Sequence, residues 1–161
     1  MKYKKTIIAL ATMAIILITL YPLIEDAPQL LEAKTNPQFY RFYKTIGYSM
    51  YPTIHNNSIV LVQLKDHPQF TLEIGDIAVY YDYIHDILVS HRIIKIINTT
   101  KTTAYWFLGD NDEQIDTPVP EEYIVGKVIL IITNQIEKTI LKNIFPQIPE
   151  WNEWKAKLIK I

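Results

Sequence analysis

The most prominent pattern in the chain is an apolar run near its beginning. Residues 6–24 carry no charge; three lysines lie in the five residues before this run, and Glu25 and Asp26 follow it. About 20 apolar residues span the hydrocarbon core of a bilayer as a helix, and lysines beside such a helix stay on the cytoplasmic side. We therefore expect residues 1–24 to form a single-pass anchor in the cell membrane, with the following domain on the extracytoplasmic side.

A cleavable signal peptide and a buried helix of a soluble domain both fit the apolar run less well. A signal peptide has a shorter apolar core that ends in two small residues separated by one position, but residues 20–24 read Leu-Tyr-Pro-Leu-Ile. A buried helix of a soluble domain would carry a polar face, and no polar face interrupts this run. The pattern favours an uncleaved anchor.

Beyond a polar linker or short helix at residues 25–38, the pattern changes to short runs rich in Ile, Val and Tyr. Turn-forming residues separate these runs, as is typical of strands with short connections. Strands are expected at residues 58–64, 76–82, 87–97, 102–108 and 126–133. The sequence predicts a mainly β catalytic domain over residues 39–133, with a coiled or barrel-like antiparallel or mixed sheet.

The tail, residues 134–161, has apolar positions at helical spacing instead. A first stripe is followed by two prolines and then by a second stripe with lysines beside it, so we expect a helical tail. The two stripes are Ile136, Ile140, Leu141 and Ile144, and then Trp151, Trp154, Leu158 and Ile161. The second stripe suits either the membrane interface, where Trp and Lys are favoured, or packing on the domain.

Composition excludes several classes of function. The 161 residues include 16 basic and 17 acidic side chains without a dense basic patch, which argues against nucleic acid as a partner. The chain has no cysteine, so a thiol nucleophile, a disulfide and a thiolate metal site are excluded. The four histidines show no metal-binding spacing, and we expect no metal and no cofactor.

Candidate chemistry lies in segments marked by the chain's four glycines. Ser49 stands between Gly47 and Pro52, where a turn can expose its hydroxyl. His91 is the polar exception on an apolar strand face, and its imidazole suits a general base. The loop at residues 109–120 carries four carboxylates. It fits a solvated acidic turn or the source of an acid that orients His91. A calcium site is a third interpretation, but the loop lacks the ligand spacing of an EF-hand.

These segments together resemble the type I signal peptidases, in the branch found in archaea and as the catalytic subunit of the endoplasmic-reticulum signal peptidase complex. Residues 47–53, Gly-Tyr-Ser-Met-Tyr-Pro-Thr, are similar to the family's nucleophile box. Residues 75–80 are similar to its strand box, residues 90–93 to its His-Arg-Ile box, and residues 109–128 to its last box. The four boxes occur in the family's order behind the expected anchor.

The resemblance implies a role for each candidate residue. Ser49 would be the nucleophile and His91 the general base. Asp116 would be the orienting acid, and Asp110 would support the loop and the geometry of the site. Most bacterial relatives use a lysine as the base. Lys95 lies four residues beyond His91, roughly 13 Å along a strand, so it is too far from the position of His91 to be an equal candidate.

The resemblance also implies the substrates. Family members cut secretory preproteins after a small residue, with another small residue two positions earlier. Shallow apolar subsites explain this choice, because a larger side chain would clash. The expected lining residues, which also suit core packing, are Ile46, Met50, Tyr51, Ile77 and Val79.

Two alternative functions remain open. One is a catalytically silent membrane-anchored subunit of the same fold, although the presence of Ser49, His91 and Asp116 argues against it. The other is a processing peptidase dedicated to a surface or pilin-like partner. The partners expected for the favoured function are preproteins with their signal peptides and the lipid bilayer.

Overall fold

The computed structural model describes residues 7, 10–14, 21, 25–146 and 158–161. Most of the predicted anchor and residues 151–157 of the expected tail helix lie outside this described part. Among the described residues, no helix is both long and apolar enough to cross a membrane. The chain divides into two compact units at residue 35, and helix α2 (Ala27–Thr35) belongs to the first.

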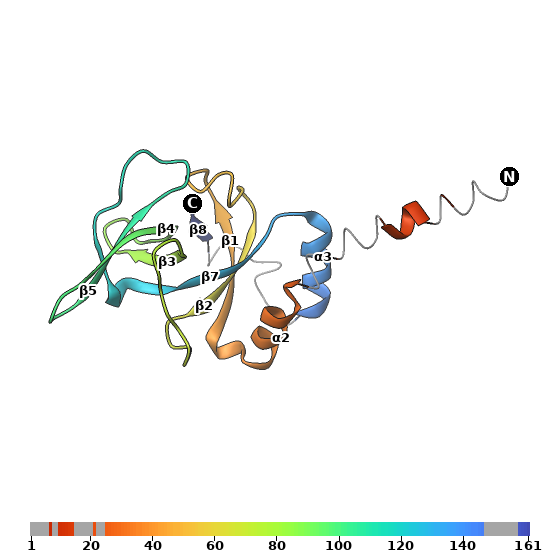
Figure 1. Cartoon of the computed structure of the whole chain (residues 1–161), viewed down its shortest axis with the longest axis horizontal. Helices are drawn as coiled ribbons and strands as arrows, with labels where there is room; N and C mark the ends of the chain where they lie inside the picture. Colours follow the sequence, from red (N-terminus) through yellow and green to blue (C-terminus); the bar gives the residue numbers. More distant parts are fainter. Residues whose placement is uncertain (1–6, 8–9, 15–20, 22–24, 147–157) are drawn as a thin grey trace. The chain divides into compact units, whose positions relative to one another are not determined.

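The second unit, residues 36–161, is built mainly of strands (Figure 1). Its elements are η1 (Pro37–Phe39), β1 (Tyr40–Ile46), β2 (Ile59–Leu64), β3 (Ile77–Asp82), β4 (Ile87–Asn98), β5 (Thr103–Leu108), β6 (Val119–Pro120), η2 (Glu121–Tyr123), β7 (Ile124–Ile132), α3 (Gln135–Ile144) and β8 (Leu158–Lys160). The five predicted strands are confirmed as β2, β3, β4, β5 and β7, with bounds within two residues of those expected. The sequence did not indicate β1, β6 or β8.

All eight strands of the described part of the chain belong to one sheet that closes on itself. The strand order is β3-β7-β2-β1-β8-β4-β5-β6, and β3 also pairs with β4. This last pairing joins six strands into a ring, from which β5 and β6 extend. β8 pairs in parallel with both β1 and β4, while the other pairings are antiparallel. The prediction of a mainly β domain with a mixed, coiled sheet is confirmed.

The two faces of β3 belong to two different apolar clusters. Successive side chains of a strand point to opposite faces, and the alternation is visible here. Ile77 and Val79 belong to the first cluster, whereas Ala78 and Tyr80 belong to the second. His91, which pairs with Ala78 in the register of β3 and β4, therefore lies next to the second cluster.

The tail is helical in one part and extended in another. Helix α3 confirms the first expected helix, and the Asn134 side chain caps its N-terminus. The expectation of a helix is wrong at residues 158–160, which form β8. Ile159 and Ile161 are buried and Lys160 between them is exposed, an alternation that fits a strand. Pairing with β8 also satisfies backbone groups on β1 and β4, which would be costly to leave unpaired.

Phe107 provides a test of the second cluster. Its side chain is fully buried, and its ring stacks 4.7 Å from that of Tyr80. Replacement Phe107→Ala should lower the free energy of unfolding by about 3–5 kcal/mol, because it leaves a cavity. Urea denaturation measures this loss. The control Ile74→Ala, at a 65% exposed position, should change the free energy of unfolding by less than about 0.5 kcal/mol. Equal losses in the two variants would contradict the assignment of Phe107 to the core.

Candidate active site

Ser49 lies in the turn that directly follows β1, and contacts on two sides hold this turn. On the inner side, Met50 and Ile54 are fully buried, and the Ile54 N–H donates to the Met50 carbonyl at 2.8 Å. On the outer side, the Asn111 N–H donates to the Ser49 carbonyl at 2.6 Å. The Asn111 side-chain amide also donates to the Tyr48 carbonyl at 3.2 Å. These contacts fix the backbone that carries the hydroxyl.

A glycine permits the loop after β5 to approach the Ser49 turn. A Cβ atom at Gly109 would lie 2.7 Å from the Ser49 carbonyl oxygen and 2.5 Å from Asp112 Oδ2. Real Cβ atoms do not come this close to other heavy atoms, so a larger residue would push the loop away. The glycine that marks this segment in the sequence therefore serves the close approach of two site segments.

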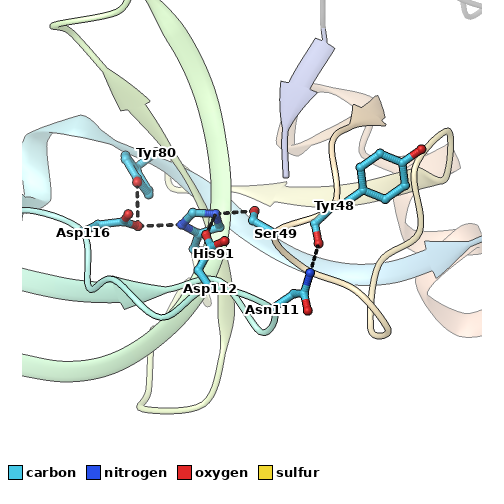
Figure 2. Close-up of polar contacts among 7 residues, drawn as sticks. All are labelled: Tyr48, Ser49, Tyr80, His91, Asn111, Asp112 and Asp116. Carbon is cyan, nitrogen blue, oxygen red and sulfur yellow. Dashed lines mark hydrogen bonds and ion pairs between the residues drawn. The ribbon is translucent and has the colours of Figure 1, made fainter.

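His91 lies between a hydroxyl and a carboxylate (Figure 2). Its imidazole, on β4, is 9% exposed. Ser49 Oγ lies 2.7 Å from Nε2, and Asp116 Oδ2 lies 2.6 Å from Nδ1. This arrangement suits a neutral imidazole whose Nδ1–H donates to Asp116 and whose Nε2 accepts from Ser49. Three residues predicted from separate segments are thus joined in one hydrogen-bonded chain.

Asp116 has a second partner that sequence reasoning did not identify. The Tyr80 hydroxyl donates to Asp116 Oδ2 at 2.8 Å. Burial, followed by the nearby Asp116 charge, raises the pKa of Tyr80, so the hydroxyl keeps its proton to donate. The Asp116 N–H also donates to the Phe107 carbonyl at 2.9 Å, which ties the loop to β5. Tyr80 stands in one of the motif segments, but only the strand register brings it beside His91.

Asp110 does not take part in the hydrogen bonds that join Ser49, His91 and Asp116. Its contacts, together with those of Arg92, link all four motif segments. Its carboxylate accepts two hydrogen bonds from the Arg92 guanidinium, at 2.8 and 2.6 Å. Asp110 also accepts from the Thr53 hydroxyl, and Arg92 donates to the Gly75 carbonyl at 2.7 Å. Burial acts to raise the pKa of Asp110, but the hydrogen bonds from Arg92 and Thr53 outweigh it, and the pKa is lowered. Such bidentate pairs fix geometry as well as charge.

A pocket of about 420 Å³ opens beside the hydrogen-bonded chain. Ser49, His91 and Asp116 line it, together with Asp112 and Tyr80. Asp112 Oδ2 lies 3.7 Å from His91 Nε2, the same nitrogen that faces Ser49. A carboxylate at this distance stabilises positive charge on an imidazole. In the sequence, Asp112 was only one of the four carboxylates of the loop at residues 109–120.

The residues expected to line substrate subsites lie in two kinds of environment. Met50, Ile77 and Val79 belong to the first apolar cluster and are buried. Ile46 and Tyr51 are 39% and 50% exposed. Within the described part of the chain, none of the five lines the pocket beside Ser49. Their role in substrate binding stays a prediction.

The chain matches no protein-family model, and no relative is found among curated proteins. Its function is therefore inferred from side-chain geometry and from the motif segments of the sequence. The strongest elements of that geometry are the three-residue chain through His91 and the ion pair of Asp110 with Arg92.

The lowered pKa of Asp110 predicts a pH-dependent contribution to stability. Because its folded-state pKa lies below the unfolded value of about 3.9, the contribution is complete above that value and is lost as the pH falls through the folded-state pKa. Asp110→Asn should therefore lower the free energy of unfolding at pH 7, and the difference from wild type should shrink below about pH 4. Denaturant titrations between pH 2 and pH 7 measure it. Glu113→Gln, in the same exposed loop, is the control; a pH-independent difference for Asp110→Asn would contradict the ion pair.

Proposed function

We propose that this protein is a membrane-anchored serine endopeptidase of the type I signal peptidase kind, which removes signal peptides from secretory preproteins at the outer membrane face. The observation that carries the proposal is the hydrogen-bonded chain from Ser49 through His91 to Asp116. It has the geometry of nucleophile, base and orienting acid that acyl transfer requires. The order of the four motif segments in the sequence adds the substrate class.

The proposed reaction uses the imidazole twice. Ser49 Oγ attacks the scissile carbonyl carbon while His91 Nε2 takes the hydroxyl proton, and the proton then passes to the leaving amine as the peptide bond breaks. Water then hydrolyses the acyl-enzyme ester: His91 takes a proton from the water and returns it to Ser49 Oγ as the ester bond breaks. Asp116 keeps Nδ1 protonated and oriented throughout, and Tyr80 keeps the Asp116 carboxylate in position.

Two charges develop during this reaction and need stabilisation. The tetrahedral intermediate carries a negative charge on the former carbonyl oxygen, and the backbone N–H of Ser49 is the proposed donor to it. The imidazolium carries a positive charge, and the carboxylates of Asp112 and Asp116 both face the ring. Asp112 thus has a proposed electrostatic role, because it lies beside the nitrogen that receives the proton.

The anchor is part of the proposal. Residues 6–24 would hold the domain at the membrane surface, where the apolar segment of a signal peptide ends. Restriction of enzyme and substrate to one surface raises their effective concentration. The proposed location is therefore a single pass through the cell membrane, with the site on the extracytoplasmic side.

Removal of either central residue should abolish cleavage. Ser49→Ala and His91→Ala should each lower kcat by about 10⁴-fold or more, because members of such a chain act as a unit. Purified full-length protein in detergent, incubated with a model preprotein, measures this.

Lys95→Ala is the control for a lysine base. The Lys95 ammonium lies 5.3 Å from the centroid of the Trp106 ring, and the variant should cleave within about twofold of wild type. If Ser49→Ala cleaves as well as wild type, the protein is not a serine peptidase. If Lys95→Ala is inactive but folded, the proposed base is wrong.

Tyr80 is expected to act as a positioning residue. Tyr80→Phe removes the hydrogen bond to Asp116 but keeps the ring, so kcat should fall about tenfold while KM stays unchanged. Tyr83→Phe is a matched control, because the Tyr83 side chain is exposed and its ring stacks on Tyr123. Steady-state kinetics on a preprotein substrate separate the two parameters. A wild-type kcat for Tyr80→Phe would remove Tyr80 from the mechanism.

A further inference from the structure

The last described strand joins the two strands that lead into the candidate active site. β1 ends three residues before Ser49, and the part of β4 that pairs with β8 ends two residues before His91. β8 lies between them, with Lys160 opposite Ile46 of β1 and Val89 of β4 (Figure 1). Since both ladders are parallel, β8 runs in the same direction as β1 and β4, toward the hydroxyl and the imidazole.

Two isoleucines at the end of the described chain, two positions apart, fill apolar sites. Ile159 is fully buried and Ile161 is 2% exposed. Both belong to the first cluster, which also contains three of the residues expected to line substrate subsites, Met50, Ile77 and Val79. Lys160 points the other way and, like Ile161, lines the pocket of Ser49. The alternation has the spacing of the small-x-small signal expected of a substrate.

The nucleophile segment is also shaped to receive a backbone. The Ile161 N–H donates to the Ile46 carbonyl at 2.7 Å. A Cβ atom at Gly47 would overlap the Ile161 carbonyl oxygen, and Gly47 has a φ of 116°, which disfavours any other residue. The glycine two positions before Ser49 therefore gives room to the strand that lies beside it.

We propose that residues 158–161 occupy the place of the substrate residues on the acyl side of the scissile bond, and that a preprotein binds by displacing β8. The inference rests on the proposed function. The incoming segment pairs in parallel with β1 and β4 and puts two apolar side chains where Ile159 and Ile161 lie. Because these sites hold isoleucine, they are deeper than the shallow subsites that the resemblance implies. Main-chain hydrogen bonds then supply affinity and the two apolar sites supply specificity. Because β8 belongs to the same chain, it competes as an intramolecular ligand and lowers resting activity.

A reversible crosslink tests whether β8 must leave. Ile46 and Lys160 are register partners with exposed side chains, and the chain has no cysteine of its own. In the full-length double variant I46C/K160C, oxidation should lower kcat/KM for a preprotein by at least about 100-fold, and reduction should restore it. The single variants I46C and K160C, treated with the same oxidant, are the controls. Equal cleavage by the oxidised and reduced double variant would overturn the proposal.

A second measurement does not require cleavage. In the Ser49→Ala form of the double variant, saturating preprotein should slow disulfide formation at least fivefold, because it holds the two cysteines apart. A preprotein with aspartate at both small positions should not. Suppose that the preprotein slows disulfide formation but the double variant that keeps Ser49 does not cleave it. This result would support the displacement of β8 and contradict the peptidase function. If the double variant that keeps Ser49 cleaves the preprotein but the preprotein does not change the rate of disulfide formation, the displacement of β8 is contradicted and the peptidase function is not.

Discussion

The two hydrogen bonds of the His91 imidazole are the contacts on which the chemistry of this site depends. They join His91 to Ser49, 42 residues earlier, and to Asp116, 25 residues later. Most other polar contacts of the site keep these two in place. Asn111 holds the Ser49 backbone, Tyr80 holds the acid, and the ion pair of Asp110 and Arg92 links the four motif segments. Much of the polar network therefore serves one imidazole.

The closed sheet explains how residues so distant in sequence meet. The pairing of β3 with β4 closes the ring and places Ala78 opposite His91, so that Tyr80, two positions along the same face, can reach Asp116. The opposite face of β3 belongs to the same apolar cluster as Ile159 and Ile161. β3 thus contributes one face to the proposed catalytic site and the other to the apolar cluster that we assign to the substrate, and both lie next to the turn that carries Ser49.

Much of this arrangement was predictable from sequence, for identifiable reasons. β2, β3, β4, β5 and β7 are runs rich in β-branched residues between turn signals, and Ser49, His91 and Asp116 stand in motif segments. β1 was not predicted because Arg41, Lys44 and Thr45 interrupt its apolar residues. β8 has only three residues, and its apolar positions also fitted a helix. The roles of Tyr80 and Arg92 depend on strand register and loop approach, which no local pattern encodes.

Trapping the covalent intermediate tests the central claim most directly. Wild-type protein would be mixed with a preprotein, quenched in acid within a single turnover and digested for mass spectrometry. The proposed mechanism predicts a mass increase equal to the acyl part of the substrate on the peptide that contains Ser49, and no such increase in His91→Ala. Product formation with the acyl group on another residue, or with no covalent adduct at any time point, would contradict it.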